Sequence, residues 1–255
     1  MMVKDKKRIE RYEIGGNVFE KHYAFDGEGV RFLKNGNELS LVKWNRELNI
    51  IQPMELKERH PNPLIRLKEA HRRKGFLKLI NPTPESVVAD VGCESGYLAE
   101  QFVGKCRQLF CIDIDDRLLS LARRRIGDGN ALFLQSNIES LPLADNTVDI
   151  AIGSEILEHL PDPGVGLKEL VRITKQGGQI VISVPNEPLI LALKGMLRTM
   201  GLKWALGRLN DRLAIGHVNI FTKKKVQQVC QGEVTISRLF YHLPFCLNLF
   251  AVLKK

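Results

Sequence analysis

The residues best suited to chemistry begin at the end of a short apolar run, residues 87–91. The run contains Asp90, and the turn after it contains Gly92, Cys93 and Gly96. Glycine lets a backbone approach a ligand closely, and a helix that starts after such a turn directs free N–H groups toward the ligand. Asp90 can reach a cationic group of that ligand. The segment therefore predicts a small-molecule site at the carboxyl edge of a parallel sheet.

A second acid, Asp113, ends the next apolar run along the chain. An acid about twenty residues after such a turn can accept hydrogen bonds from both hydroxyls of a ribose. The glycine spacing Gly92-x-x-x-Gly96 lacks the dinucleotide fingerprint, which disfavours a pyrophosphate ligand. Together the two motifs predict a nucleoside-binding site, and a nicotinamide oxidoreductase is a remote alternative.

Alternating strand and helix patterns surround these motifs. Short apolar runs separated by amphipathic segments predict a Rossmann-like, doubly wound α/β fold, with a mostly parallel sheet and helices on both faces. Two strand-like runs at 234–240 and 245–253 predict an antiparallel hairpin at the end of that sheet. The expected strands are 87–91, 109–113, 131–135, 148–153 and 179–184, and the expected helices are 97–103, 117–126 and 164–174.

The first part of the chain has a different pattern. Asp26-Gly27 and Asn35-Gly36 each separate short runs of β-forming residues, which predicts a small β-meander within residues 1–60. Residues 64–80 carry apolar residues among Arg and Lys, which predicts a helix with a basic polar face.

Composition and cysteine usage narrow the class of protein. A chain of 255 residues that is 44% hydrophobic and 26% charged is typical of a globular protein, and residues 1–13 lack the apolar stretch of a secretory signal. The five cysteines are scattered and form no CxxC pair, so we expect no metal site, no disulfide framework and a cytoplasmic location.

Charge is distributed unevenly along the chain. Residues 87–187 contain 15 Asp and Glu against 9 Lys and Arg, whereas residues 188–255 contain 2 against 11. An acidic middle suits a cationic ligand, and a basic end suits an anionic partner.

Residues 87–230 resemble a class I S-adenosylmethionine-dependent methyltransferase of the small-molecule type. The resemblance is carried, in the family's order and spacing, by residues 90–96, 110–115, 137–143, 148–160, 177–186 and 216–222. It implies a seven-stranded, mostly parallel sheet with S-adenosyl-L-methionine as cofactor. It also implies a methyltransferase domain at 61–255, with a helical lid insert at about 188–215, behind the β-rich extension at 1–60.

The resemblance also assigns cofactor-binding residues by position. Asp113 would hold the ribose, and Ile114 and Ile138 would lie on the two sides of the adenine. Glu94 stands where the family usually has glycine, so a positive φ there would carry strain. The full expected set is Asp90, Gly92, Cys93, Gly96, Asp113, Ile114, Asn137, Ile138 and Glu155.

Candidate catalytic residues are His159 and His217, which fall in segments that open toward substrate in the family. Either is a candidate general base, and a packing or hydrogen-bonding role is an equal or better alternative for each. Glu155 has a helix-capping alternative of the same weight.

The acceptor is not readable from the sequence. Residues 189–213 are amphipathic and basic, which suits either a lid packed on the domain or contact with an anionic membrane surface. We therefore expect methyl transfer to a small or lipid-linked, anionic acceptor. The alternatives are an RNA methyltransferase that uses the basic flanks, which is not favoured, and a non-catalytic S-adenosylmethionine-binding protein.

Overall fold

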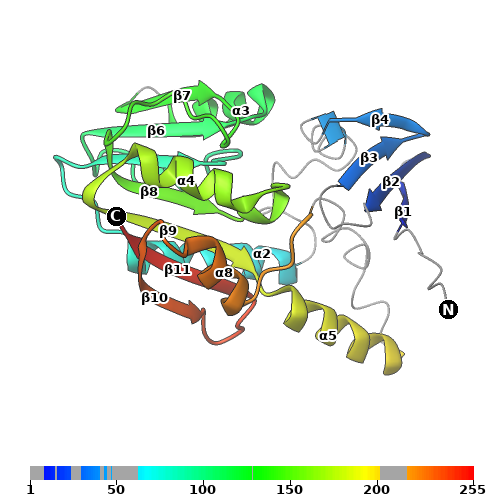
Figure 1. The fold of residues 1–255 in the computed structure, drawn as a ribbon. Coiled ribbons are helices and arrows are strands. Elements are labelled where there is room, and N and C mark those ends of the chain that lie inside the picture. The colour runs from blue at the N-terminus through cyan, green and yellow to red at the C-terminus, as the bar shows by residue number, and fades with distance from the viewer. Residues whose placement is uncertain are drawn as a thin grey trace.

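The computed structural model shows a seven-stranded mixed sheet covered by helices on both faces (Figure 1). It describes residues 9–14, 16–23, 30–40, 43–44, 47, 63–127, 129–201 and 217–255. The strand order is β10-β11-β9-β8-β5-β6-β7, which confirms the predicted fold class. The chain first runs outward from β5 and then returns to β8 on its other side. Open α/β sheets bind ligands at such a switch point, beyond the carboxyl ends of the strands.

The strands of the sheet are parallel from β7 to β9, and β11 is antiparallel to both β9 and β10. Every residue of β5 is buried, as expected for a strand that is covered on both faces. The bounds are β5 Val87–Val91, β6 Gln108–Asp113, β7 Ala131–Gln135, β8 Val148–Ser154, β9 Thr174–Pro185, β10 Thr235–Tyr241 and β11 Asn248–Lys254.

Two hydrophobic cores, one on each face, hold the helices against this sheet. On one face α4 (Pro163–Ile173) and α8 (Lys223–Cys230) pack through residues such as Leu167 and Val226. On the other face α2 (Pro63–Leu79) and α3 (Asp116–Ile126) pack through residues such as Phe76 and Leu119. Figure 1 shows α4 and α8 in front of the sheet and α2 behind it.

The helix expected at 97–103 is wrong. Only a short 3₁₀ helix, η2 (Ala99–Gln101), forms there between turns. The segment lies against the second core through Ala99 and Phe102, so its apolar residues are buried without a regular helix. The apolar residues that predicted a helix at 97–103 are thus apolar because they are buried, and not because they form one face of a helix.

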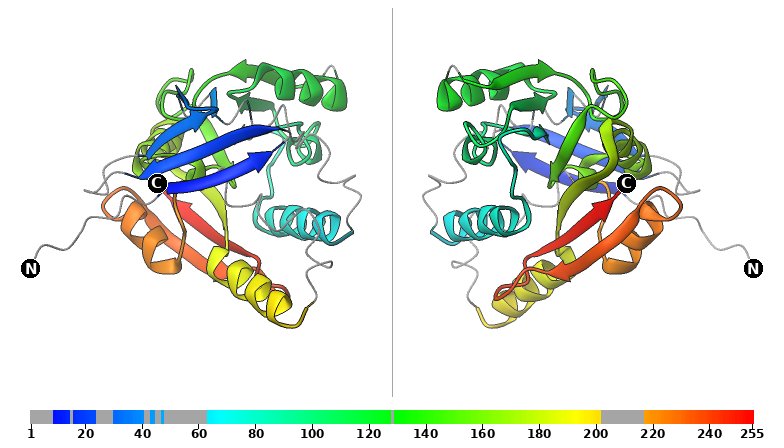
Figure 2. Two further views of the ribbon diagram at one scale, coloured as in Figure 1. Left: turned by 90° about the vertical axis from the view of Figure 1, so that its right-hand side faces the viewer. Right: turned by 90° about the vertical axis from the view of Figure 1, so that its left-hand side faces the viewer.

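A separate four-stranded antiparallel sheet precedes the main one, in agreement with the predicted β-meander. Its strands are β1 Ile9–Ile14, β2 Asn17–Tyr23, β3 Val30–Lys34 and β4 Asn37–Leu39. Trp44 fills a small core of its own against Phe19 and Phe32, with ring centroids 5.2 Å apart in both cases. The sheet lies beyond the carboxyl ends of the parallel strands (Figures 1 and 2), where Lys21 Nζ donates a hydrogen bond to the carbonyl of His217 at 2.7 Å.

A helix leaves the sheet after β9 and projects from the body of the molecule (Figure 1). This helix, α5 (Glu187–Thr199), forms the first half of the expected lid insert, and residues 202–216 lie outside the described residues. Among the helices that the structure describes, none has the length and apolar character that crossing a membrane requires.

A glycine in the turn after β5 lets α3 pack closely against that turn. Gly96 has a φ of +77°, and an added Cβ would lie 3.1 Å from the Cα of Ala122 in α3. Gly104 has a similar φ of +72° with nothing within 4 Å. We predict that Gly96→Ala lowers the free energy of unfolding by about 2 kcal/mol or more, because overpacking adds to backbone strain, whereas Gly104→Ala costs about 1 kcal/mol. Urea denaturation measures both, and equal losses would contradict the packing role.

Candidate active site

The carboxyl end of β5 carries a buried carboxylate, Asp90. Asp90 is 1% exposed, and neither of its carboxylate oxygens has a hydrogen-bond partner among the described residues. Burial raises the pKa of Asp90 to about 7, and the positive charge of Arg72 offsets only part of that effect. An unsatisfied buried carboxylate is costly, so this position is suited to a ligand that supplies a donor or a positive charge.

The neighbouring strand β6 ends in a second buried carboxylate. Asp113 accepts hydrogen bonds from the backbone N–H groups of Glu94 and Asp115, each at 2.9 Å. Burial raises its pKa to about 6, although these two hydrogen bonds act in the opposite direction. Asp115 in turn begins α3 as its N-cap and accepts from the Arg117 N–H at 3.0 Å. Asp113 therefore fixes the β5 turn beside the start of α3.

The turn between these acids brings the backbone close to its surroundings. Gly92 has a φ of +76°, and an added Cβ would lie 2.7 Å from Ile156 Cδ1. Glu94 has a φ of +48°, so the strained position expected from the sequence is present. The Cys93 thiol is buried, and a hydrogen bond with Cys111 together with burial raises its pKa well above the ordinary value. Cys93 therefore stays a neutral thiol at the site.

A pocket of about 490 Å³, counted to its open mouth, lies against Asp90 and this turn. Of the expected cofactor-binding residues, Asp90, Gly92 and Cys93 line it. The complete lining is Glu69, Arg72, Arg73, Phe76, Asp90, Gly92, Cys93, Glu94, Ser95, Tyr97, Leu98 and Ser154.

Helix α2 contributes charged residues that the sequence reasoning did not assign to the site. The Arg72 guanidinium forms an ion pair with Glu69 and donates to Ser154 Oγ at 2.6 Å. Arg73 lies over the Tyr97 ring, 4.3 Å from its centroid. The only signal in the sequence was the basic face predicted for residues 64–80, which does not show that this face turns inward.

Six of the predicted cofactor residues lie outside that pocket lining, and Asp113 and Glu155 are two of them. Gly96 packs against α3, and Ile114 is half-buried directly after β6. The Asn137 side chain bonds within its own turn, where its oxygen accepts from the Glu139 N–H at 3.2 Å and its nitrogen donates to the Glu139 carboxylate at 2.7 Å. Ile138 is buried in the first core. Their contacts with a cofactor remain predictions.

Glu155 connects the pocket to the neighbouring part of the strand edge. It has a φ of +51°, and its carboxylate lies 3.5 Å from Lys68 Nζ and 3.8 Å from the Arg72 guanidinium. It also accepts a hydrogen bond from the Asn248 side chain. Glu155 therefore pairs with Arg72 of the pocket lining as well as with Lys68.

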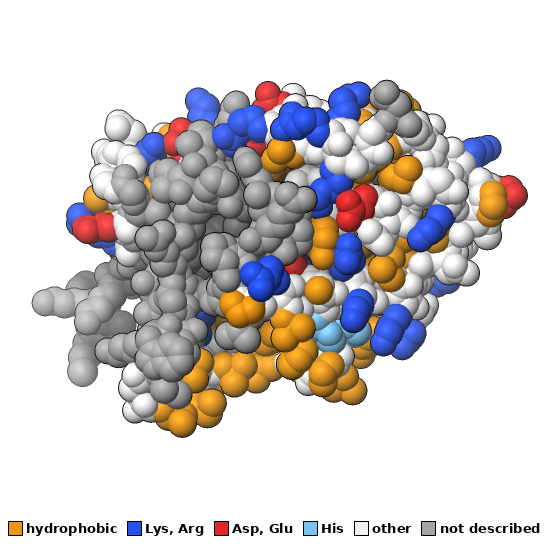
Figure 3. Space-filling model, turned by 180° about the vertical axis from the view of Figure 1, so that it is seen from behind, with side chains coloured by type: hydrophobic (Ala, Val, Ile, Leu, Met, Phe, Trp, Pro, Cys, Tyr) orange, Lys and Arg blue, Asp and Glu red, His pale blue; other side chains and the backbone are white. Residues whose placement is uncertain are grey.

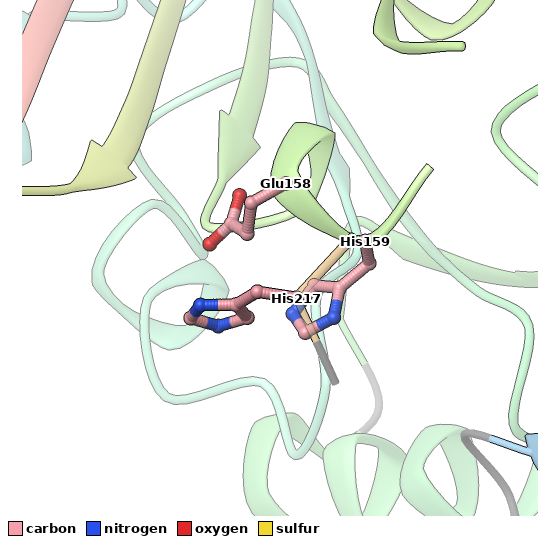
Figure 4. A group of neighbouring side chains, drawn as sticks. All are labelled: Glu158, His159 and His217. Carbon is pink, nitrogen blue, oxygen red and sulfur yellow. The ribbon is translucent and has the colours of Figure 1, made fainter. Parts of the chain in front are cut away.

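The two candidate catalytic histidines come together, although 57 positions separate them in the chain. His159 ends the 3₁₀ helix η3 (Leu157–His159), and its ring centroid lies 4.9 Å from that of His217 at an angle of 77°. The His217 Nδ1 contacts the carboxylate of Glu187 at the start of α5. Figure 4 shows Glu158 beside the two rings. The sequence did not single out Glu158, because an acid in a turn is usually exposed.

An acid therefore stands at the end of each of two neighbouring strands of a Rossmann-like sheet, at the edge where such sheets bind ligands. Residues 89–182 match the protein family described as "Methyltransferase domain". This match agrees with the resemblance to class I methyltransferases seen in the sequence.

Two curated relatives match the same region. A probable S-adenosylmethionine-dependent methyltransferase of Mycobacterium tuberculosis is 30% identical over 99 residues, which cover 39% of this chain and 35% of that protein. A ubiquinone/menaquinone biosynthesis C-methyltransferase of Serratia proteamaculans is 32% identical over 113 residues, which cover 42% of this chain and 45% of that protein. The chain thus spans less than half the length of these relatives.

Solved structures share the fold over a larger part of the chain. The N-methyltransferase NodS of Bradyrhizobium japonicum, in complex with S-adenosyl-L-homocysteine, has a TM-score of 0.57 at 18% identity and covers 84% of this chain and 96% of its own. A SAM-dependent methyltransferase of Aquifex aeolicus has a TM-score of 0.54 at 16% identity and covers 84% and 98%.

The raised pKa of Asp90 makes the stability of the ligand-free protein depend on pH. The carboxyl group of Asp90 binds its proton more tightly in the folded protein than in the unfolded protein. Proton binding at Asp90 therefore stabilises the fold fully below about pH 4, and this stabilisation is lost as the pH rises through about 7. We predict that Asp90→Asn raises the free energy of unfolding at pH 8 relative to the unsubstituted protein. The change that the substitution causes at pH 8 should exceed the change at pH 4 by more than about 1 kcal/mol.

Denaturant titrations at the two pH values measure this difference. Glu85→Gln, which neutralises an exposed acid just before β5, is the matched control and should show no such change. If Asp90→Asn changed the free energy of unfolding equally at both pH values, the raised pKa of Asp90 would be contradicted.

Proposed function

We propose that this protein is a methyltransferase that uses S-adenosyl-L-methionine to methylate a small acceptor. The observation that carries the proposal is the pair of buried carboxylates at the ends of β5 and β6, of which Asp90 has no partner among the described residues. The methyltransferase domain match at residues 89–182 supports it.

The residues at the pocket fit the cofactor group by group. Asp90 would bind the α-ammonium of the methionine part, which supplies the missing donor. Arg72 and Arg73 across the pocket would bind its carboxylate. Asp113 would accept from the ribose hydroxyls, and Gly92 leaves room for the chain between them.

Bound S-adenosyl-L-methionine supplies a methyl group already activated by a sulfonium. The chain's own work is therefore to orient the acceptor in line with the S–CH₃ bond and to exclude water. When the acceptor atom bonds to the methyl carbon, the S–C bond breaks with its electron pair on sulfur. A proton lost by the acceptor then passes to a base or to water, and His159 and His217 are our candidates for that base.

Asp113→Ala tests the cofactor site. We predict at least about tenfold weaker binding of S-adenosyl-L-methionine, because the ribose loses a charge-assisted hydrogen-bond acceptor. Isothermal titration calorimetry measures the affinity, and circular dichroism checks that the variant is folded. Asp145→Ala, which removes an exposed acid paired with Arg172, should bind with unchanged affinity. Unchanged affinity in Asp113→Ala would contradict the site.

Catalysis is tested by transfer of labelled methyl groups from the cofactor to a fractionated cell extract. Transfer that disappears in the Asp113→Ala protein supports an enzyme. Cofactor binding without transfer to any fraction would favour the non-catalytic alternative.

We further propose that the acceptor is lipid-linked and meets the protein at an anionic membrane surface. Large apolar side chains are exposed on α5 and on the turn between β10 and β11. The two segments are neighbours, because the side chain of Asn186, just before α5, donates a hydrogen bond to the carbonyl of Cys246 in this turn at 2.8 Å. Figure 3 shows the hydrophobic side chains gathered along one edge of the molecule. We call this set the apolar edge: Leu191, Leu193, Met196, Met200, Leu243 and Phe245.

The basic composition of residues 188–255 suits an anionic surface. The curated relatives named for ubiquinone and menaquinone biosynthesis are consistent with an apolar acceptor.

Liposome flotation tests this surface. We predict that the protein co-floats with vesicles of phosphatidylcholine and phosphatidylglycerol, and that Leu191→Glu with Met196→Glu abolishes this because two charges enter the apolar edge. Leu132→Glu on β7 is the matched control, since Leu132 is 49% exposed and Met196 is 51% exposed. Absence of the unsubstituted protein from the lipid fraction would contradict the proposal.

A further inference from the structure

Three side chains at the carboxyl edge of the sheet surround one point. Glu158 and His159 come from η3, and His217 lies at the start of the segment that leads to α8. One ligand atom from each of the three lies within 4.8 Å of the other two. Figure 4 shows the Glu158 carboxylate pointing toward the His217 ring, with the His159 ring beside it.

Glu158 is the reason to expect a ligand at this point. Its side chain is fully buried, and neither carboxylate oxygen has a hydrogen-bond partner among the residues that the structure describes. A carboxylate in this position needs a proton, a donor or a cation. Its backbone carbonyl accepts from the N–H groups of Val218 and Asn219 at 2.8 and 3.1 Å, so the chain beside His217 is fastened to Glu158 itself.

His217 is oriented in the way that metal-binding histidines are oriented. Its Nδ1 contacts the Glu187 carboxylate, which leaves Nε2 as the ring nitrogen for an ion. Histidine ligands in proteins typically give their other ring nitrogen to such a carboxylate, which fixes the tautomer and the direction of the ring.

The surrounding charges also favour a cation. Glu155 and Glu187 add negative charge near Glu158, and Lys68 is the positive group that acts against it. Lys68 lies 3.5 Å from Glu155, so part of its charge is already balanced.

We propose that Glu158, His159 and His217 bind one divalent transition-metal ion, such as Zn²⁺. Two imidazoles and one carboxylate suit such an ion better than Mg²⁺ or Ca²⁺, which prefer oxygen ligands, and three protein ligands leave open positions for another molecule. This differs from the sequence expectation of no metal site, which rested on the spacing of cysteines alone.

The site lies close to the cofactor pocket, because Glu155 contacts Arg72 of the pocket and acts electrostatically on Glu158. The ion would therefore bind and orient an oxygen of the acceptor beside the methyl group. This role rests on the proposed function, whereas binding of the ion does not. The acceptor class that follows is a molecule with a metal-binding oxygen next to the atom that is methylated.

Calorimetry with ZnCl₂ on the full chain, first dialysed against a chelator, tests the site. We expect one equivalent of Zn²⁺ to bind, and at least about tenfold weaker binding in both Glu158→Gln and His217→Gln, because each loses a ligand. Glu158→Gln is nearly isosteric and removes the buried charge, so it should fold. His71→Gln is the matched control, because His71 belongs to a histidine pair elsewhere, with its ring centroid 4.1 Å from that of His242.

The outcomes separate the two proposals. Equal Zn²⁺ affinity in the unsubstituted protein and Glu158→Gln, or an equal loss in His71→Gln, overturns the metal site. Titration of S-adenosyl-L-methionine into the same metal-free samples should give unchanged affinity in Glu158→Gln. If the cofactor binds and Zn²⁺ does not, the metal site is wrong and the methyltransferase proposal stands. If Zn²⁺ binds and the cofactor does not, the site stands and the proposed function is wrong.

Discussion

The structure depends on one electrostatic constraint, which is a carboxylate at the end of the central strand with no partner in the described protein. Asp90 is buried there because β5 is covered on both faces and lies between its neighbours β6 and β8. A charge in that position is costly until a cationic group arrives. Burial of the Asp90 charge therefore destabilises the ligand-free protein, and a cationic ligand group would remove this cost on binding.

The same edge of the sheet carries a second unsatisfied acid, and one residue joins the two places. Glu155 lies between Arg72, which faces Asp90, and Glu158, which faces the two histidines. The pocket beside Asp90 and the cluster around Glu158 are thus linked through the residue that directly follows β8.

Most strands of the main sheet were predictable because they are short apolar runs, although β9 begins at Thr174, five residues before the predicted start at 179. β5 and β7 have the predicted bounds, and β6 and β8 each differ from prediction by a single residue at one end. The segment near Phe102 was not predictable, because burial in a turn and burial in a helix give the same local pattern. The acids Asp90 and Asp113 stood out in the sequence because a strand end is a costly place for a charge without a ligand; both are buried, and their contact with a cofactor stays a prediction.

The sequence by itself determined the order of strands and helices, the turn after β5 and the acids at two strand ends, because these depend on local pattern and on spacing along the chain. Only the tertiary structure decided that Arg72 of α2 faces Asp90 and that His159 meets His217. It also decided that the Glu158 side chain points inward rather than into water. The physical reason is that such contacts join distant segments, and packing of both faces of the sheet, not local preference, sets their direction.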